Sequence, residues 1–290
     1  MMKNFEYLAP KTVKDALTLL AGDQGDSKVI AGGQSLLLLM GHGLVTPKYL
    51  IDIKGISSLN YLQKTQSGLE IGSLTTHRSV ETSPLIRNGF CVLAQMEGAL
   101  ASLETRNWGT LGGNVCHADP KGDVCPVLIA LGAKVKMISL RGERTMAVED
   151  FSTGYFETAL NPDELLAEIQ VPNPPPRTGT AYHKFTMIEG DYAIVSTTVS
   201  ITLDASNEKC KDARIVLGAV APAPMRAKRA EKVLVGREIK DSLLQEAAQI
   251  ASEEAEPVSD MHASDEYKRE LVKVLVKRVG KEALEKAGMA

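Results

Sequence analysis

The chain has 290 residues, 44% of them hydrophobic, so it is long enough for two domains that each bury a core. Its net charge is −3, and the interspersed acidic and basic residues leave no basic stripe of the kind that binds nucleic acid. The longest apolar run, Leu36 to Met40, is too short to span a membrane, and Met1 to Pro10 lacks the apolar segment of a secretion signal. We therefore expect a cytoplasmic protein with no membrane span and no nucleic-acid partner.

Cysteine and histidine spacing does not indicate a metal site. The four cysteines lack a Cys-x-x-Cys pair, and the five histidines include no His-Glu-x-x-His motif. We expect free thiols and no metal in this chain. His117, close to Asp119 and to a glycine-rich loop, is the one histidine that we consider as a ligand contact.

The first predicted element is a short amphipathic helix. Thr12 stands three residues before Asp15 in a capping-box-like start, and apolar residues follow at helical spacing. A strand at 28–30 then leads into a glycine-rich turn. The apolar run 36–40 predicts a helix that departs from this turn and packs inside the protein.

Strands and helices continue to alternate up to residue 171, which indicates an α+β domain. The predicted strands are 49–53, 69–73, 133–138 and 165–171. Three helices are predicted: one begins near residue 79, one covers about 93–103, and one covers 127–131.

A proline-rich stretch divides the chain. Four prolines occupy the five positions 172–176, and such a sequence favours polyproline II over a strand ladder. We therefore predict one domain at residues 1–176 and a second at 177–290. Three β-rich segments of the second domain precede three helices: 181–187, 193–203 and 213–220, then 225–235, 241–254 and 264–287. This order predicts a three-stranded antiparallel sheet packed on helices.

Two segments place a Gly-Gly pair beside small polar side chains: Ala31-Gly32-Gly33-Gln34-Ser35 and Thr110-Leu111-Gly112-Gly113-Asn114. Glycine permits positive φ and lets backbone N–H groups approach a ligand without a Cβ in the way. Successive N–H groups in such turns form an anion-binding concavity. Because two concavities can hold two linked phosphates, we expect a dinucleotide cofactor.

Three better-known motifs are absent. The Rossmann pattern Gly-x-Gly-x-x-Gly fails after Gly41-His42-Gly43, where Thr46 occupies the third glycine position. No Gly-Lys-Ser/Thr of a phosphate-binding P-loop occurs. A Gly-x-Ser-x-Gly nucleophile elbow fails because Leu37 follows Gly33-Gln34-Ser35 at its last position. We therefore interpret Ser35 as a ligand donor, and we expect no catalytic residue in this chain.

With these residues in view, the chain resembles the FAD-binding medium subunits of the molybdenum hydroxylases, the group that includes xanthine dehydrogenase, carbon monoxide dehydrogenase and quinoline oxidoreductase. The likeness covers nearly the whole chain. It rests on the two Gly-Gly segments, Asp123, the segment 163–172, Lys184 and Gly-Asp-Tyr-Ala at 190–193. It implies a two-subdomain FAD-binding domain of the vanillyl-alcohol oxidase type, followed by a small flavoprotein C-terminal domain.

The resemblance also implies roles for individual residues. The two Gly-Gly segments would hold the pyrophosphate, and Asp123 would bind ribityl or ribose hydroxyls. Leu166 would pack near the flavin, Lys184 would reach the flavin edge, and Tyr192, preceded by Asp191, would lie over the isoalloxazine ring. These roles suit the side chains, because a carboxylate accepts hydrogen bonds from hydroxyls and a lysine stabilises negative charge on a reduced flavin.

The resemblance implies an oxidoreductase subunit that carries FAD and passes electrons from 2Fe-2S clusters to an external acceptor. The clusters would lie on a small partner subunit and a molybdenum-pterin centre on a large one, in a dimer of heterotrimers (a heterohexamer). Two alternatives remain open at this point. The chain could be a self-sufficient FAD-dependent oxidoreductase of the same fold, or a nucleotide-binding regulatory or assembly module without redox chemistry.

Overall fold

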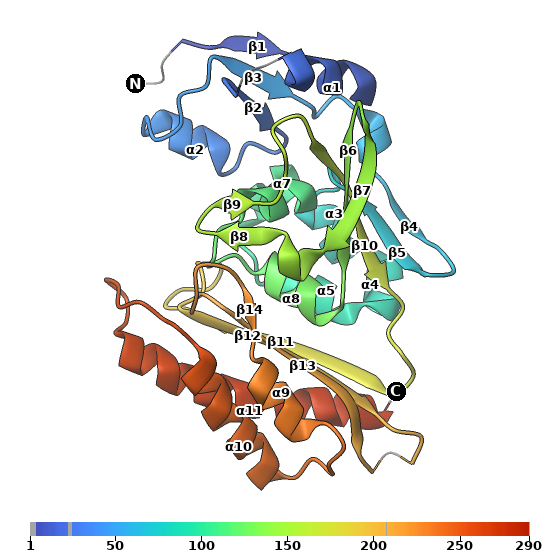
Figure 1. Cartoon of the computed structure of the whole chain (residues 1–290), viewed down its shortest axis with the longest axis vertical. Helices are drawn as coiled ribbons and strands as arrows, with labels where there is room; N and C mark the ends of the chain where they lie inside the picture. The colour runs from blue at the N-terminus through green and yellow to red at the C-terminus, as the bar shows by residue number, and fades with distance from the viewer. Residues whose placement is uncertain (1–3, 23–24, 207, 290) are drawn as a thin grey trace.

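The computed structural model describes residues 4–22, 25–206 and 208–289 and arranges them in three layers (Figure 1). The first two layers come from residues up to Pro172, and the third comes from residues after the proline-rich stretch. Within the described residues, no helix is both long and apolar enough to cross a membrane.

The first layer is a three-stranded parallel sheet, in the order β1-β3-β2, with two helices. Thr12 begins the first helix as predicted, since its hydroxyl accepts a hydrogen bond from the amide of Asp15 at 3.1 Å. The elements are β1 (Glu6–Leu8), α1 (Val13–Gly22), β2 (Ser27–Ile30), α2 (Leu36–Gly41) and β3 (Tyr49–Asp52).

The second layer is a five-stranded antiparallel sheet, in the order β4-β5-β10-β6-β7, covered by six short helices. Its strands are β4 (Leu62–Lys64), β5 (Gly68–Gly72), β6 (Lys134–Ser139), β7 (Gly142–Ala147) and β10 (Leu165–Pro172), with the hairpin β8 (Ser152–Gly154) and β9 (Glu157–Thr158) alongside. Its helices are α3 (His77–Thr82), α4 (Pro84–Gly89), α5 (Cys91–Gly98), α6 (Leu103–Trp108), α7 (Leu111–His117) and α8 (Val124–Ala130). Apolar residues of the sheet and helices form one continuous core.

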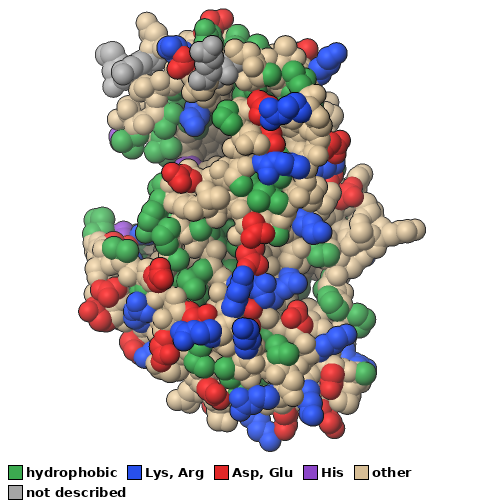
Figure 2. Space-filling model, in the orientation of Figure 1, with side chains coloured by type: hydrophobic (Ala, Val, Ile, Leu, Met, Phe, Trp, Pro, Cys, Tyr) green, Lys and Arg blue, Asp and Glu red, His purple; other side chains and the backbone are tan. Residues whose placement is uncertain are grey.

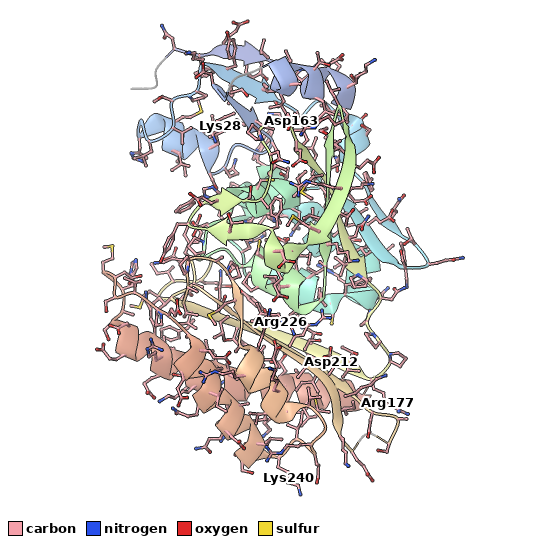
Figure 3. The ribbon with its side chains drawn as sticks, viewed as in Figure 1. Lys28, Asp163, Arg177, Asp212, Arg226 and Lys240 are labelled. Atoms are coloured by element: carbon pink, nitrogen blue, oxygen red, sulfur yellow. The ribbon has the colours of Figure 1, made fainter. Side chains whose placement is uncertain are left out.

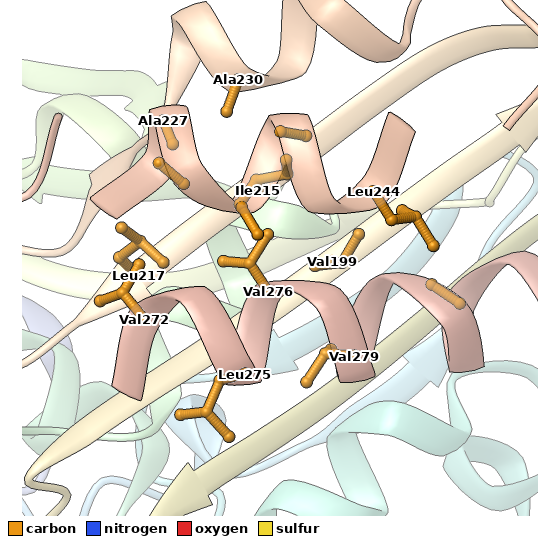
Figure 4. Packing of buried hydrophobic residues seen from close by; sticks show 14 of the residues in the cluster. Val199, Ile215, Leu217, Ala227, Ala230, Leu244, Val272, Leu275, Val276 and Val279 are labelled. Atoms are coloured by element: carbon orange, nitrogen blue, oxygen red, sulfur yellow. The ribbon is translucent and has the colours of Figure 1, made fainter. Parts of the chain in front are cut away.

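The third layer is an antiparallel sheet with helices on its outer face. Valines and leucines of the last helix pack on the sheet, as Val272 and Val276 do beside Ile215 and Leu217 (Figure 4). The strands are β11 (Thr178–Phe185), β12 (Val195–Leu203), β13 (Cys210–Gly218) and β14 (Met225–Arg226). The helices are α9 (Lys228–Leu234), α10 (Asp241–Glu254) and α11 (Asp265–Met289).

The inner face of the third sheet rests on α5 and α8 of the second layer. Arg226, labelled in Figure 3, bridges the two layers, with Glu149 at 3.2 Å on one side and Glu231 at 2.7 Å on the other. Every residue of β12 is buried, because helices cover one side of the sheet and the second layer covers the other. This packing fixes the third layer against the part of the chain that carries the glycine loops.

The structure corrects the prediction that the apolar helix at 36–40 packs inside. Met40 is buried, but Leu37 and Leu38 of α2 are 41% and 65% exposed. The physical reason is the small size of the first layer, where α2 covers only a three-residue cluster of Ile30, Met40 and Leu50. An apolar sequence shows that a helix has a preference for burial, but not that this chain supplies the covering surface.

Other boundaries also differ from the prediction. The helix expected at 93–103 ends at Gly98, and α6 begins separately because Ser102 caps it through the amide of Thr105 at 3.2 Å. The third sheet has a fourth strand, since Met225 and Arg226 pair with β13 before α9 begins. Pro172 ends β10 opposite Gly68, so the strand ladder runs one residue into the proline-rich stretch.

Candidate cofactor site

A cavity of about 540 Å³ lies where the three layers meet. Its walls come from β2 and α2 of the first layer, from helices and strands of the second, and from the turn between β11 and β12 of the third. Figure 2 shows the surface hollowed between the first two layers, beside the hydrophobic side chains of α2. The volume is within the range of cavities that bind small molecules and cofactors.

The cavity brings together residues that are far apart in the sequence. Thirteen of the fifteen residues proposed above as cofactor contacts line it: Ala31, Gly32, Gly33, Gln34, Ser35, Thr110, Gly112, Gly113, Asn114, Asp123, Leu166, Asp191 and Tyr192. The other two lie behind the wall. Leu111 is fully buried in the core of the second layer, and Lys184 reaches the site through an ion pair with Asp123.

The two glycine loops lie directly against each other. A Cβ on Gly32 would lie 2.2 Å from the carbonyl oxygen of Trp108 and 2.7 Å from the Cα of Gly109. A Cβ on Gly113 would approach Ala31, at 3.9 Å from its Cβ. Gly32 is therefore required for the close packing that joins the loops into one surface.

The loops differ in the amides that they offer. In the first loop, where Gly33 turns the chain at φ +73°, the amides of Gly32 to Ser35 have no hydrogen-bond acceptor among the described residues. The second loop is itself the first turn of α7, which Thr110 caps. Four amides there are already bonded: Leu111 to Thr75, Gly112 to Ser73, Gly113 to the Thr110 hydroxyl, and Asn114 to the Thr110 carbonyl. The second segment therefore does not form the concavity of free N–H groups that its Gly-Gly pair predicted. The first loop has the free amides of an anion-binding turn, whereas the second can offer a ligand only its side chains and the close approach that its glycines allow.

Asp123 is the centre of a buried polar group contributed by the second and third layers. Its carboxylate accepts a hydrogen bond from the Tyr182 hydroxyl at 2.7 Å and pairs with the Lys184 ammonium at 2.7 Å. The side chains of Asp123 and Lys184 are 6% and 7% exposed. Burial raises the pKa of Asp123, and Lys184 and Tyr182 oppose that change by stabilising the carboxylate. Lys184 is thus a buried partner of Asp123, not a solvated surface charge.

Lys184 also positions the turn that carries Tyr192. Its ammonium donates to the carbonyl oxygen of Asp191 at 2.9 Å. Gly190 has φ +87°, and a Cβ there would approach the Ala101 carbonyl at 3.0 Å, so the turn packs on the second layer. Tyr192 is 57% exposed at the cavity rim, and desolvation together with Asp119 raises its pKa to about 12. It therefore keeps a neutral phenol at physiological pH.

Several residues that the sequence did not single out also line the cavity. Glu164 is held by Arg144, with a nitrogen–oxygen distance of 2.7 Å. Ser73 has a buried hydroxyl without a hydrogen-bond partner among the described residues. His77 lines the cavity as well, and so does His117, the histidine that we considered. Nothing in the sequence distinguishes His77, because its partner Glu97 is twenty residues away and no local motif links them.

The residues present fit a cofactor with linked phosphates. Four consecutive unbonded amides suit one phosphate group, and the second loop lets a ligand approach its backbone closely. The orphaned Ser73 hydroxyl needs a partner that the described residues do not supply. Apolar residues such as Leu166 and Leu39 line the same cavity, as required for an aromatic ring.

Comparison with protein families assigns both parts of the chain. Residues 3–174 match the FAD binding domain in molybdopterin dehydrogenase, and residues 180–283 match the CO dehydrogenase flavoprotein C-terminal domain. The chain belongs to this family. It is an FAD-binding subunit of the molybdenum hydroxylase group, as the sequence motifs indicated, and its relatives are subunits of oxidoreductase complexes.

Curated relatives match over nearly their full length. The chain is 34% identical over 284 residues to the 6-hydroxypseudooxynicotine dehydrogenase complex subunit alpha of Paenarthrobacter nicotinovorans, covering 98% of this chain and 96% of the relative. It is 33% identical over 284 residues to the carbon monoxide dehydrogenase medium chain of Afipia carboxidovorans, covering 98% of each.

Solved structures agree with the fold throughout. Carbon monoxide dehydrogenase from Hydrogenophaga pseudoflava superposes with a TM-score of 0.95 at 33% identity, over 99% of each chain. Quinoline 2-oxidoreductase from Pseudomonas putida 86 gives a TM-score of 0.93 at 33% identity, also over 99% of each chain. The predicted fold, an FAD-binding domain followed by the flavoprotein C-terminal domain, is confirmed.

The family match names FAD as the cofactor that this cavity would hold. FAD exchanges electrons singly or in pairs, and the protein supplies binding, orientation and electrostatic tuning. In this chain the free amides of the first loop and the side chains of Ser35, Thr110 and Asn114 are the groups available to hold the diphosphate. Asp123, Leu166 and Tyr192 line the part of the cavity that the second and third layers enclose.

Proposed function

We propose that this chain carries FAD as an electron relay, accepting electrons from 2Fe-2S clusters of a partner subunit and delivering them to an external acceptor. The observation that carries the proposal is the match to a carbon monoxide dehydrogenase medium chain over 98% of both chains. The cavity supports it, because its polar groups suit cofactor binding and electrostatic tuning.

The proposed complex has a small iron–sulfur subunit and a large molybdenum-pterin subunit, assembled as a dimer of heterotrimers in the cytoplasm. Relatives named as subunits or medium chains of complexes support this assignment. The exposed leucines of α2 support it as well, because contiguous exposed apolar side chains mark interaction surfaces. We propose domain limits of 1–176 and 177–290, between β10 and β11.

Each residue of the site has a proposed role. The two glycine segments, Ala31 to Ser35 and Thr110 to Asn114, enclose the pyrophosphate, with Leu111 anchoring the second in the core. Asp123, whose two oxygens already bind Tyr182 and Lys184, accepts cofactor hydroxyls through its remaining lone pairs. Leu166 packs near the flavin. Lys184 acts on the flavin through Asp123 and the Asp191 carbonyl, and Tyr192 covers the ring.

Purification of the native complex tests the proposal. The expected result is noncovalent FAD, recovered intact after acid precipitation, together with iron, molybdenum and two partner subunits. Rapid mixing with the substrate of the complex should bleach the iron–sulfur bands before or with the flavin band. A chain that purifies alone and turns over a substrate with its own FAD would instead support the self-sufficient oxidoreductase. A chain without flavin would overturn the cofactor assignment.

A further inference from the structure

His77 and Glu97 form a buried pair that the roles proposed above do not use. His77 Nδ1 lies 2.8 Å from Glu97 Oε2, and the side chains are 3% and 0% exposed. The other carboxylate oxygen, Oε1, has no hydrogen-bond partner among the described residues. A carboxylate buried without a compensating positive charge costs several kcal/mol.

Lys184, the buried cation of the Asp123 group, does not bind this pair. Lys184 binds Asp123 and the carbonyl of Asp191. A hydrogen on Nε2 would leave no net charge on the buried His77–Glu97 pair, either as imidazolium with carboxylate or as neutral imidazole with protonated Glu97. In both forms one proton lies between Nδ1 and Oε2, so the second nitrogen, Nε2, carries a hydrogen.

The position of the ring places this N–H at the cofactor cavity. His77 lines the cavity, and the ring turns its Nδ1 away toward Glu97. The opposite edge lies beside Gly109, where an added Cβ would be 2.9 Å from Cδ2 and 3.4 Å from Nε2. Gly109 in turn packs against Gly32. The Nε2 edge is therefore next to the junction of the two glycine loops, and Nε2 has no hydrogen-bond partner among the described residues.

We propose that His77 binds the cofactor by donating its Nε2–H to a diphosphate oxygen, and that Glu97 is the positioning residue that keeps the hydrogen on Nε2. The inference rests on the cavity being the FAD site. It adds a side-chain donor on the face of the second loop, whose own amides 111–114 are already bonded. A fixed donor next to an anion gives a charge-assisted hydrogen bond with no proton to be taken up on binding.

Nitrogen-15 spectra of the imidazoles in the full chain, labelled at its five histidines, test the protonation. Signals of His77 are assigned by their loss in His77→Gln. We expect an Nε2–H signal without FAD between about pH 6 and pH 9, and a shift of that signal when FAD is added. In Glu97→Gln we expect the Nε2–H form to lose its dominance. Neutral His77 in the wild-type chain with hydrogen on Nδ1 alone would overturn the proposal.

Binding measurements test the contact. His77→Leu should lower the affinity for FAD about 10- to 100-fold, the range for losing a hydrogen bond to a charged group. It should lower the affinity for ADP by the same factor. His77→Gln, which keeps a donor, should lose less. His183 is the matched control, because it also pairs with a glutamate, Glu282 at 2.7 Å, but on the surface; His183→Leu should bind FAD normally.

The outcomes separate this inference from the cofactor assignment. If the wild-type chain and His183→Leu bind FAD and His77→Leu binds it equally well, only the role of His77 is wrong. If His77→Leu binds FAD more weakly but binds ADP as the wild type does, the proposed contact with the diphosphate is wrong. If the wild-type chain binds no FAD at all, the cavity assignment itself fails. Should His77→Leu not fold, His77→Gln and the wild-type spectrum still decide.

Discussion

Removing one partner of the buried Asp123–Lys184 pair should destabilise the fold. Lys184→Met removes the cation and leaves a buried carboxylate whose one remaining side-chain partner among the described residues is Tyr182. We expect the free energy of unfolding to fall by about 3–5 kcal/mol, as found when one partner of a buried pair is removed. Denaturant unfolding of the chain without added FAD measures this loss.

A double substitution separates the charge from the contact. Asp123→Asn with Lys184→Met removes both charges and keeps an acceptor for Tyr182, so it should be more stable than Lys184→Met alone. Lys277→Met, at an exposed pair with Asp241, is the control and should cost under about 1 kcal/mol. If the stability loss of the double variant equals the sum of the losses in Asp123→Asn and Lys184→Met, the two residues are not coupled.

Glu164 makes stability depend on pH in the acid range. Two hydrogen bonds from Arg144, both 2.7 Å, lower the pKa of Glu164 to about 2. Because the folded pKa lies below the unfolded value of 4.5, the contribution of this carboxylate is complete above about pH 4.5 and is lost as the pH falls toward 2. Arg144→Gln raises the folded pKa, so the variant should lose less stability over that window.

The difference in unfolding free energy between about pH 5 and pH 3 measures the effect. We expect the wild-type chain to lose about 1–2 kcal/mol more than Arg144→Gln over this interval. Arg141→Gln, at a neighbouring exposed pair with Asp163, should behave as the wild type. Equal acid sensitivity in all three chains would contradict the role of Arg144.

At the scale of the elements, substitutions in the two glycine loops should have different effects, one on stability and FAD binding together and one on FAD binding alone. Gly32→Ala places a methyl group 2.2 Å from the backbone oxygen of Trp108, so the loops must separate, and we expect a loss of about 1–3 kcal/mol together with weak FAD binding. Gly113→Ala meets the movable Thr110 hydroxyl at 2.8 Å and the Ala31 Cβ at an ordinary contact distance of 3.9 Å. It should therefore fold nearly normally and lose FAD affinity about tenfold.

Gly98→Ala is the matched control, since a Cβ there meets nothing within 4 Å and the residue lies in α5. It should keep both stability and FAD affinity. Circular dichroism, thermal unfolding and FAD titration on the three variants separate the two defects. Normal FAD affinity in folded Gly113→Ala would remove the second loop from the cofactor site.

Local patterns predicted many of the elements but not their surroundings, and β1, β4, β7 and α7 had no predicted counterpart. The capping box at Thr12 and the strand before Gly32 were predictable because neighbouring residues decide them. The short strand β14 was not, because two residues carry no periodicity and pair only when β13 lies beside them. Exposure of Leu38 was equally invisible, since burial depends on the size of the layer behind the helix.

The candidate site shows the same division. Motif residues such as Gly33 and Asn114 could be found from sequence because glycine pairs have a local conformational meaning. The hydrogen bonds of the Leu111 and Gly112 amides could not, because their acceptors are carbonyls of Thr75 and Ser73, nearly 40 residues earlier in the chain. The His77–Glu97 pair required the packing of α3 on α5.

At the scale of the whole molecule, the third layer closes the cavity with a residue that can control access. Tyr192 is half exposed at the rim, on a turn that Lys184 tethers through Asp191. If electrons enter the flavin from a partner and leave to an external acceptor, the covering ring affects only the second step. Tyr192→Ala in the assembled complex should therefore change turnover with the acceptor at least several-fold, while Tyr192→Phe, which keeps the ring, should resemble the wild type.

Stopped-flow absorbance that follows the iron–sulfur and flavin bands separately measures both steps. With the substrate of the complex and no acceptor, reduction should proceed at the same rate in Tyr192→Ala and the wild-type complex, because this half-reaction does not use the covered face. With acceptor, reoxidation of the flavin should differ. Equal slowing of both phases would mean that Tyr192 supports the fold of the site. Substrate hydroxylation by the lone subunit would overturn the relay itself, since it would show that the chemistry is not divided between subunits.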